Sequence, residues 1–470
     1  MSAESVSEPR PDNFPHLTNS RPLVWDRAAS GPAAERLVAR LLPELLANEV
    51  RKRARRGEDL KRLRSVLEVF VLDLVMAAKE DPGRFIAYPL RRQEFGTELK
   101  RYSFPAATRT TVVAVAKFLQ ASDYALGTLG SYSRTDWGNG VSTGGGYRSR
   151  LRGTQKLMAL VRELGVSSDD IGTRGDFELI RLKSRSEGGR KELKGYVDND
   201  QTRAWRAELQ RWAELAAAHR IVAPAGLMLP EGVLKDEDDG AGELIDPRRA
   251  QLYRVFNDGR FDRGGRFYGG WWMGLSKAAR ASITIDGEPV VELDFKAFYP
   301  RLCYDLEGVE LDPSIDPYEV PALKGRVARK ALKVALNQLI AVGPGVTPRR
   351  PQGANIPSRL PYRAVLEALE TQHPAMRPWL RQARSLELQR IDSEIAGGVL
   401  RYMTTERARP VLPVHDSFVV AGRDEATLGE AMARTYRAVV GERSVKGAWP
   451  VIDGWSSPAL RDEVSQRLGL

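Results

Sequence analysis

The sequence predicts an α+β protein, with a mainly helical N-terminal half followed by a half in which strands and helices alternate. Up to about residue 240, apolar residues recur mainly with helical spacing. An acidic, glycine-containing stretch at 235–243 is typical of a linker, and beyond it short β-prone runs alternate with helical patterns. With 470 residues, 42% of them hydrophobic, the chain is long enough for two to three domains with their own cores.

The composition favours a nucleic-acid partner and a metal held by oxygen ligands. The formal net charge of +11 favours a polyanion, although an arginine-rich composition from a GC-rich genome also explains it. The single cysteine, Cys303, excludes an intrachain disulfide, and four histidines offer no zinc-site spacing. Any metal is therefore expected to be magnesium or manganese.

Neither a membrane span nor a secretory signal is predicted. The longest apolar stretch, at 66–78, is interrupted by Glu68 and Asp73, and a membrane helix needs roughly 18 to 20 uncharged apolar residues. The N-terminus lacks a basic start followed by an apolar segment. We therefore expect a cytoplasmic protein without a membrane partner, and the sequence leaves its oligomeric state open.

The N-terminal half divides into a tail and a nucleic-acid-binding region. Residues 1–30 are polar and rich in proline and serine, which predicts a disordered tail. Region 31–240 is expected to bind nucleic acid. Its first part, from about 33 to 79, has helical spacing and contains the basic run RKRARRGEDLKRLR at 51–64. That run fits either a solvated helix face or a row of phosphate contacts.

Residues 108–165 have the element order of a winged helix. A helical stretch, TRTTVVAVAKFLQAS, precedes a glycine- and serine-rich segment at 127–146 that is typical of a hairpin. The basic stretch YRSRLRGTQKLMALV then becomes helical. Helix, glycine-rich wing and basic strand in this order resemble winged-helix DNA-binding domains. The alternative is a small helical domain with a long surface loop.

The first segment that points to chemistry is EPVVELDFKAFYPRL at 288–302. Residues 290–293 are β-prone and follow the turn Asp286-Gly287. Asp294 stands at the end of this predicted strand, beside a new helical segment. A carboxylate there suits a metal ligand, but alone it is more often a helix N-cap.

The second segment is GRVARKALKVALNQLIAVGPG at 325–345. Its spacing is helical, and Gly343-Pro344 is expected to stop the helix. Arg329, Lys333 and Asn337 recur every fourth residue and therefore share one face. Two cations and an amide on a helix face suit a triphosphate, and they also suit a solvated basic face.

The third segment is RPVLPVHDSFVVAG at 409–422. Two β-prone runs flank His415-Asp416-Ser417, which predicts a tight hairpin with Asp416 at its tip. Pro413 favours an edge strand, because proline has no amide to donate to a neighbour. Taken alone, an aspartate in a turn is usually only a turn residue.

The order and joint content of the three segments resemble motifs A, B and C of family A DNA polymerases and of phage-type single-subunit RNA polymerases. Motif A corresponds to Asp294, Phe295 and, seven residues on, Arg301; motif B to Arg329 and Lys333; motif C to Val414-His415-Asp416. Two further segments are similar: GRFYGGWW, with Arg266, to the family's minor-groove arginine segment, and LELQRIDSEI, with Gln389 and Glu394, to its glutamine-containing helix. The resemblance covers roughly residues 255–425.

Three departures separate this chain from the family pattern. Ala341-Val342 replaces the usual Tyr-Gly end of motif B, which puts fidelity in question. Ser417 follows the motif C aspartate, as in the RNA polymerases, where DNA polymerases carry a glutamate. The motif spacings are short, and no acidic cluster resembles a proofreading exonuclease.

The resemblance implies a palm with an antiparallel sheet and helical fingers at 245–470. It implies that Asp294 and Asp416 bind two Mg²⁺ ions (Mn²⁺ as a substitute) and catalyse template-directed DNA synthesis. Nucleotide binding then falls to Arg329, Lys333, Asn337 and Tyr299, and contact with the DNA template–primer to Arg266, Gln389 and His415. A compact polymerase with a winged helix also suggests a mobile element or plasmid.

Tyr299 bears on the choice between dNTPs and NTPs. It lies five residues after Asp294, where family A DNA polymerases carry a glutamate and the phage-type RNA polymerases a small residue. A bulky ring there would clash with a ribose 2′-hydroxyl, which favours dNTPs; alternatively, Tyr299 is a core aromatic ahead of Pro300. An RNA polymerase or primase on the same palm, favoured by Ser417, remains the first alternative. A non-catalytic DNA-binding or replication-initiator protein is the second.

Overall fold

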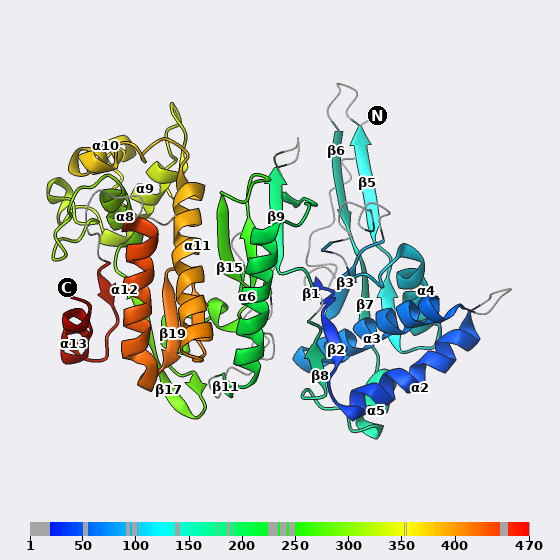
Figure 1. Ribbon diagram of the computed structural model, residues 1–470. Coiled ribbons are helices and arrows are strands. Elements are labelled where there is room, and N and C mark those ends of the chain that lie inside the picture. Colours follow the sequence, from blue (N-terminus) through cyan, green and yellow to red (C-terminus); the bar gives the residue numbers. More distant parts are fainter. Residues whose placement is uncertain are drawn as a thin grey trace, which may run out of the picture. The chain divides into compact units, whose positions relative to one another are not determined.

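The computed structural model describes residues 19–49, 55–90, 95, 101–102, 104–136, 142–175, 177–185, 189, 191–223, 234–235, 242–243, 250–351, 353, 355–441 and 450–469. It mixes helices and strands, as predicted, in two compact units (Figure 1). Unit 1 comprises residues 1–178 and 228–249, and unit 2 comprises 179–227 and 250–470. Among the residues that the structure describes, no helix is long and apolar enough to cross a membrane.

Unit 1 is built around one long buried helix and a small sheet. Its helices are α2 (Pro32–Asn48), α3 (Gly57–Glu80), α4 (Arg109–Ala121) and α5 (Gln155–Glu163). Its strands are β1 (Ser20–Pro22), β2 (Arg27–Ala29), β3 (Phe85–Tyr88), β4 (Ala125–Thr128), β5 (Ser131–Asp136), β6 (Ser142–Tyr147), β7 (Ser149–Gly153), β8 (Ile171–Thr173), β12 (Leu234–Lys235) and β13 (Gly242–Glu243). The main sheet has the order β1-β3-β7-β4, in which β1 and β3 are parallel and the other neighbours antiparallel.

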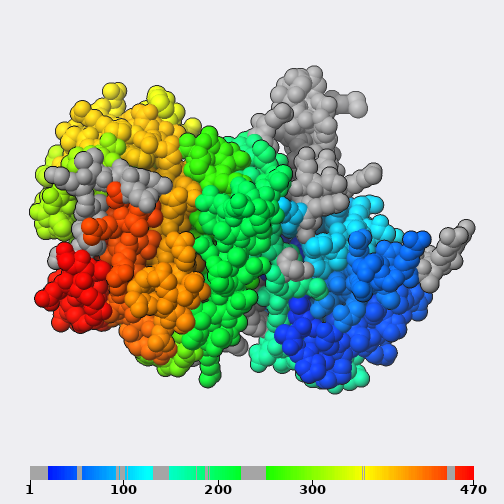
Figure 2. Space-filling view, in the orientation of Figure 1, coloured from blue at the N-terminus to red at the C-terminus, as the bar shows by residue number. Residues whose placement is uncertain are grey.

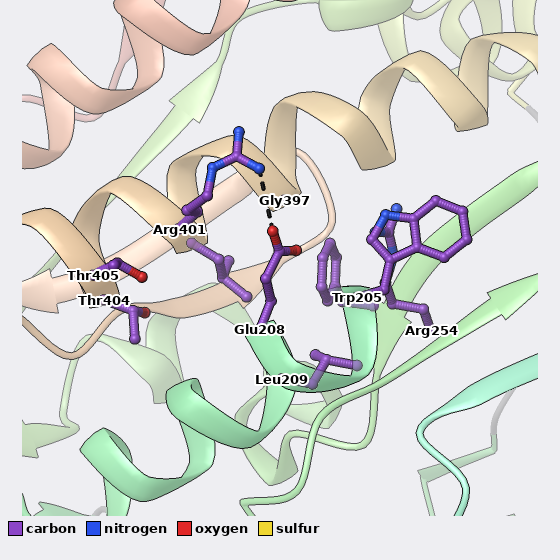
Figure 3. A pocket seen from close by; sticks show the side chains of 10 residues that line it. Trp205, Glu208, Leu209, Arg254, Gly397, Arg401, Thr404 and Thr405 are labelled. Carbon is purple, nitrogen blue, oxygen red and sulfur yellow. Dashed lines mark hydrogen bonds and ion pairs between the residues drawn. The ribbon is translucent and has the colours of Figure 1, made fainter. Parts of the chain in front are cut away.

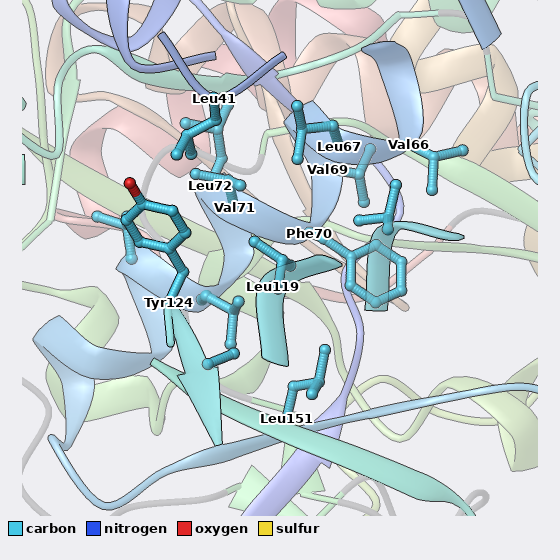
Figure 4. Packing of buried hydrophobic residues seen from close by; sticks show 14 of the residues in the cluster. Leu41, Val66, Leu67, Val69, Phe70, Val71, Leu72, Leu119, Tyr124 and Leu151 are labelled. Atoms are coloured by element: carbon cyan, nitrogen blue, oxygen red, sulfur yellow. The ribbon is translucent and has the colours of Figure 1, made fainter. Parts of the chain in front are cut away.

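Helix α3 supplies a larger share of the core of unit 1 than any other element. Every residue from Val66 to Ala78 is buried, which is typical of a helix enclosed on all sides. Figure 4 shows Phe70, Leu72 and their neighbours packed between Leu41 of α2 and Leu151 of β7. The two charged residues within this stretch, Glu68 and Asp73, must therefore find partners inside the protein.

Asp73 finds them in the segment that was predicted to be a disordered tail. Arg21 donates two hydrogen bonds of 2.8 Å to the Asp73 carboxylate, and the Val24 amide donates a third of 3.0 Å. The Arg27 guanidinium lies 3.4 Å from the same carboxylate. Because of these contacts, residues 20–22 and 27–29 form strands, so the prediction of a tail up to residue 30 is wrong over 19–30; residues 1–18 lie outside the described chain.

The predicted order of helix, hairpin, basic strand and helix at 108–165 is confirmed. It corresponds to α4, the antiparallel pair β5 and β6, then β7 and α5. The four-stranded sheet was not predicted, because strands of three to five residues are too short for a clear alternating pattern. Within the basic run at 51–64, Lys61 and Arg64 of α3 form exposed pairs with glutamates, which favours a solvated helix face, and Arg55 pairs with Glu49 before the helix begins.

Unit 2 contains the three segments singled out above. Its helices are α6 (Asp200–Ala217), α7 (Lys277–Arg280), α8 (Phe298–Leu306), α9 (Arg329–Ala341), α10 (Tyr362–Gln372), α11 (Ser385–Arg401), α12 (Glu425–Gly441) and α13 (Pro458–Leu468). Its strands are β9 (Ile180–Arg185), β10 (Lys191–Leu193), β11 (Ile221–Val222), β14 (Tyr253–Phe256), β15 (Gly264–Tyr268), β16 (Thr284–Ile285), β17 (Glu288–Phe295), β18 (Leu412–Val414), β19 (Ser417–Ala421) and β20 (Ile452–Asp453).

The larger sheet of unit 2 has the order β11-β16-β17-β19-β18, with β20 also pairing with β17, and every pairing is antiparallel. Strand β18 is at the edge, as Pro413 predicted. Figure 1 shows α11 and α12 side by side across β17 and β19, and in Figure 2 their side chains form a continuous orange surface. A smaller sheet, β10-β9-β14-β15, packs against α11 through β15.

The division between the units differs from the predicted boundary at 240–245. Residues 179–227 belong to unit 2, because α6 is anchored there by its tryptophans. The Trp205 ring stacks on Phe256 at 4.6 Å, and the Trp212 indole donates a 2.8 Å hydrogen bond to the Val411 carbonyl. Of the predicted linker at 235–243, the structure describes only residues 235, 242 and 243, which belong to the antiparallel pair β12 and β13.

The buried Asp73 cluster generates a stability prediction for unit 1. Asp73→Asn removes the carboxylate that holds Arg21 with two hydrogen bonds and leaves the buried guanidinium only its 3.1 Å contact with Glu80, so we expect a loss of about 3 kcal/mol in the free energy of unfolding. Hydrogen exchange of the α3 amides measures this locally. Glu58→Gln, which removes an exposed partner of Lys61 on the same helix, is the control and should leave α3 protection unchanged. Equal protection in both variants would show that the cluster does not stabilise α3.

Candidate active site

The register of two neighbouring strands brings Asp294 and Asp416 together. On β17, Asp294 is directly opposite Ser417, the first residue of β19. The Phe295 amide donates a 3.2 Å hydrogen bond to the carbonyl of Asp416. The predicted strand at 290–293 and the predicted hairpin at 411–420 are both confirmed. The two carboxylates, which come from distant parts of the sequence, therefore lie at the same end of the sheet.

The backbone beside each carboxylate is in an unusual conformation. His415 has a φ of 57° in the turn that leads into Asp416, and Ala297 has a φ of 48° between Asp294 and α8. Residues other than glycine adopt this left-handed region at a cost of order 1 kcal/mol or more, and such positions concentrate at functional sites. The surrounding sheet holds both turns in place.

The two carboxylates repel each other in a half-buried setting. Burial, and then the charge of Asp416, raises the pKa of Asp294 to about 7; the cations Lys277 and Lys333 act in the opposite direction. Burial, and then Asp392, raises the pKa of Asp416, while Arg266 opposes that shift. Two neighbouring carboxylates whose negative charge is not neutralised by the protein are suitable ligands for a divalent cation such as Mg²⁺. Among the described residues no group of three or more metal-binding side chains occurs, so the protein's contribution would be this pair.

Arg266, Asp392 and Tyr299 form a buried network beside Asp416. The Arg266 Nε donates a 2.7 Å hydrogen bond to Asp392, and its Nη2 donates one of 2.5 Å to the Tyr299 hydroxyl. Asp392 is 3% exposed, and burial raises its pKa as well as that of Tyr299. Arg266, predicted to touch the template–primer, is thus engaged inside the protein. Asp392 was missed, because its role depends on Arg266, which lies 126 residues away in the sequence.

Gly265 allows α11 to approach β15 closely enough for this network. Its φ is 93°, and an added Cβ would lie 2.7 Å from the Phe256 ring and 2.8 Å from the Ser393 hydroxyl. Ser393 follows Asp392 on α11, so a larger residue at 265 would push Asp392 away from Arg266.

The other two residues predicted to contact the template–primer lie near this network. Gln389 lies three residues before Asp392 on the same face of α11 and is half-buried. The His415 ring meets Tyr268 of β15 edge-on at 6.0 Å.

The basic face of α9 lies near the carboxylates. Arg329, Lys333 and Asn337 are all exposed on this helix, as the four-residue spacing predicted. Arg329 lies 5.0 Å and Lys333 5.9 Å from the centroid of the Tyr318 ring. Burial, and then the charge of Asp416, raises the pKa of Tyr318, while Arg329 opposes that shift. Arg329 also pairs with Asp316.

Two further residues from the motifs have structural partners. Arg301, the arginine of motif A, is buried and donates to the carbonyls of Pro313 (3.0 Å) and Ile315 (2.7 Å), which fixes the loop leading to Tyr318. Ser417 donates a 2.9 Å hydrogen bond to Glu292, which also pairs with Arg280 at 2.7 Å. Glu292, Arg280 and the nearby Lys277 escaped sequence reasoning, because their roles depend on partners that only folding brings close.

A small pocket elsewhere in unit 2 has a structural explanation. It has a volume of only about 10 Å³ and lies between α6, β14 and the end of α11. Figure 3 shows Trp205 beside Arg254, and Glu208 paired with Arg401. Arg254 is 2% exposed and donates to the Gly265 and Ser393 carbonyls, at 2.8 and 3.2 Å. Burial, and then Arg390, lowers the pKa of Arg254 to about 9. The pocket therefore marks where α6 is anchored to α11.

A comparison of the chain with protein-family models gives no match, and a comparison with curated protein sequences gives none either. The interpretation of the site therefore depends on the motif residues and their geometry.

The repulsion between the carboxylates generates a prediction that can be tested without substrate. A carboxyl group whose pKa is higher in the folded than in the unfolded chain destabilises the fold progressively as pH rises through that pKa. Asp294→Asn should therefore stabilise the metal-free protein by on the order of 1 kcal/mol above pH 7, and by little near pH 4. Thermal unfolding in EDTA across this pH range measures the difference. Asp453→Asn, an exposed position opposite Asp294 on β20, is the control. A destabilised Asp294→Asn protein at pH 8 would contradict the repulsion.

Proposed function

We propose that the protein is a template-directed nucleotidyltransferase that adds deoxynucleotides to a DNA primer. The observation that carries the proposal is the pairing of β17 with β19, which sets Asp294 beside Asp416 within reach of the cationic face of α9. Two carboxylates and a row of cations are what phosphoryl transfer requires, because the reaction depends on positioning and charge neutralisation.

Asp294 and Asp416 would hold two divalent cations, whose chemistry is to acidify the primer 3′-hydroxyl and to neutralise the triphosphate. Lys333 is exposed and already lowers the pKa of Asp294, so it is placed to contact a phosphate that bridges the two elements. Arg329 would exchange Asp316 for a phosphate when nucleotide binds. Asn337, two turns from Arg329, extends the same face.

Tyr299 supports deoxynucleotide use. Its hydroxyl accepts a hydrogen bond from Arg266, which also donates to Asp392, and the charge of Asp416 is among the causes that raise its pKa, after burial and Asp392. An immobilised ring there would exclude a 2′-hydroxyl by contact. Ser417, which favours the RNA polymerase or primase alternative, donates to Glu292, so its presence has an explanation apart from the choice of product.

Primer extension tests the proposal. Wild-type protein with a primed DNA template, Mg²⁺ and dNTPs is expected to extend the primer. Asp294→Asn and Asp416→Asn should each lower the rate at least about 100-fold, because each removes a metal ligand. Asp453→Asn should keep wild-type activity. Extension by either active-site variant at more than a few per cent of the wild-type rate would refute the two-metal assignment, and an inactive wild type with intact DNA binding would favour the non-catalytic alternative.

Sugar choice provides a separate prediction. Tyr299→Ala should accept NTPs at least about tenfold more readily relative to dNTPs, equivalent to roughly 1.4 kcal/mol of lost discrimination. Tyr299→Phe keeps the ring and loses the hydroxyl bond to Arg266 that holds it, so its discrimination should lie between that of the wild type and that of Tyr299→Ala. The measurement is kcat/KM for each nucleotide in single-addition assays. A wild-type preference for NTPs would instead identify an RNA polymerase.

A further inference from the structure

The main sheet of unit 1 has one face that is covered and one that is basic. Ser149 and Leu151 of β7 are 4% and 0% exposed and face α3, together with Ile86 of β3. Side chains alternate along a strand, so Arg150 and Arg152 point to the opposite face, and Arg148 precedes them at the same spacing. Arg148 is exposed, and the other two are half-exposed.

The register shows which residues surround these arginines. Arg150 is opposite Ala87 of β3 on one side and Thr128 of β4 on the other. Arg152 is opposite Leu126 of β4, and its guanidinium lies 5.4 Å from the centroid of the Phe85 ring. Leu126 is 48% exposed. The outer face is therefore a line of guanidinium groups with apolar side chains beside it.

Local hydrogen bonds orient this line. The Arg150 Nε donates a 3.0 Å hydrogen bond to the Ser20 hydroxyl, and its Nη1 donates one of 2.6 Å to the Arg148 carbonyl. At the end of the sheet, the Asp81 carboxylate accepts from the Gly83 amide and from Asn19, at 2.6 and 2.7 Å. The guanidinium of Arg150 is thus held along the strand. Asp81 is engaged by its own neighbours, and the charge of Arg152 adds to the causes that lower its pKa.

We infer that the outer face of the β1-β3-β7-β4 sheet binds single-stranded nucleic acid, with the phosphate backbone along β7. Alternate residues of a strand are about 7 Å apart, a spacing comparable to that of successive phosphates in an extended strand. Leu126 and Phe85 lie where unpaired bases would rest, and apolar contact with base faces tolerates any sequence. A duplex keeps its bases stacked inside and would meet only the arginines. This site is independent of the nucleotidyl transfer proposed for unit 2.

The test is equilibrium binding of the full-length protein to a labelled oligo(dT) and to a DNA hairpin duplex, by fluorescence anisotropy between 50 and 200 mM salt. The sheet variant replaces Arg148, Arg150 and Arg152 with glutamine. The matched variant replaces Arg40, Lys61 and Arg64, which pair with glutamates on α2 and α3, and so loses the same charge. No nucleotide is added, so the result does not depend on catalysis.

For the sheet variant we expect at least fivefold weaker binding to oligo(dT) and a salt slope lower by about 2, because three phosphate contacts are lost. The matched variant should change neither. Leu126→Ala should weaken oligo(dT) binding and leave the duplex unaffected. The single variant Arg148→Gln, at an exposed position, should lower the slope by about 0.7 and guards against misfolding of the triple variant. Equal losses in the sheet and matched variants, or equal losses for oligo(dT) and duplex, would overturn the inference.

Discussion

The antiparallel register of β17 and β19 is the constraint on which the candidate site depends. Because side chains alternate along a strand, a slip of one residue would move Asp294 to the opposite face of the sheet from Asp416. Burial specifies the register: Leu293 and Phe418 are a cross-strand pair, and both are 0% exposed. Phe295 packs edge-on against Phe418 at 6.4 Å. The apolar residues of the two strands therefore determine where the charged ones lie.

Bringing two carboxylates together is unfavourable, and the elements around them offset the cost. On one side, α11 and β15 supply a buried arginine–aspartate pair, in which Arg266 stabilises the charge of Asp416 while its own partner, Asp392, opposes it. On the other side, Lys333 reaches toward Asp294 from α9. Neither side neutralises the pair completely, and this remaining negative charge is what a divalent cation requires. The repulsion between the two carboxylates thus lowers the stability of the metal-free fold, and the same negative charge would attract a divalent cation.

Local patterns in the sequence predicted the elements that carry the motifs, because each pattern depends on neighbouring residues. The hairpin around Asp416 follows from β-prone runs on both sides of a polar turn, and the face of α9 from a four-residue spacing. The unpredicted features depend on partners far away in the sequence. Asp392 acts through Arg266, and the strands at 20–29 exist because Arg21 and Asp73 meet in the core of unit 1. The residues next to Asp392 or Arg21 in the sequence do not indicate which distant side chain each of them will contact.

In the proposed polymerase, Arg266 would link sugar selection to metal binding. One nitrogen of its guanidinium holds the Tyr299 hydroxyl and another holds Asp392, while its charge favours the ionised form of Asp416. Arg266 is 21% exposed in its side chain, so water screens these contacts only partly. The ring proposed to select the sugar and the carboxylate proposed to bind metal thus share one cation. In the proposed polymerase, displacement of Arg266 by a bound duplex would loosen Tyr299 and raise the pKa of Asp416 together, so discrimination and rate would change in concert.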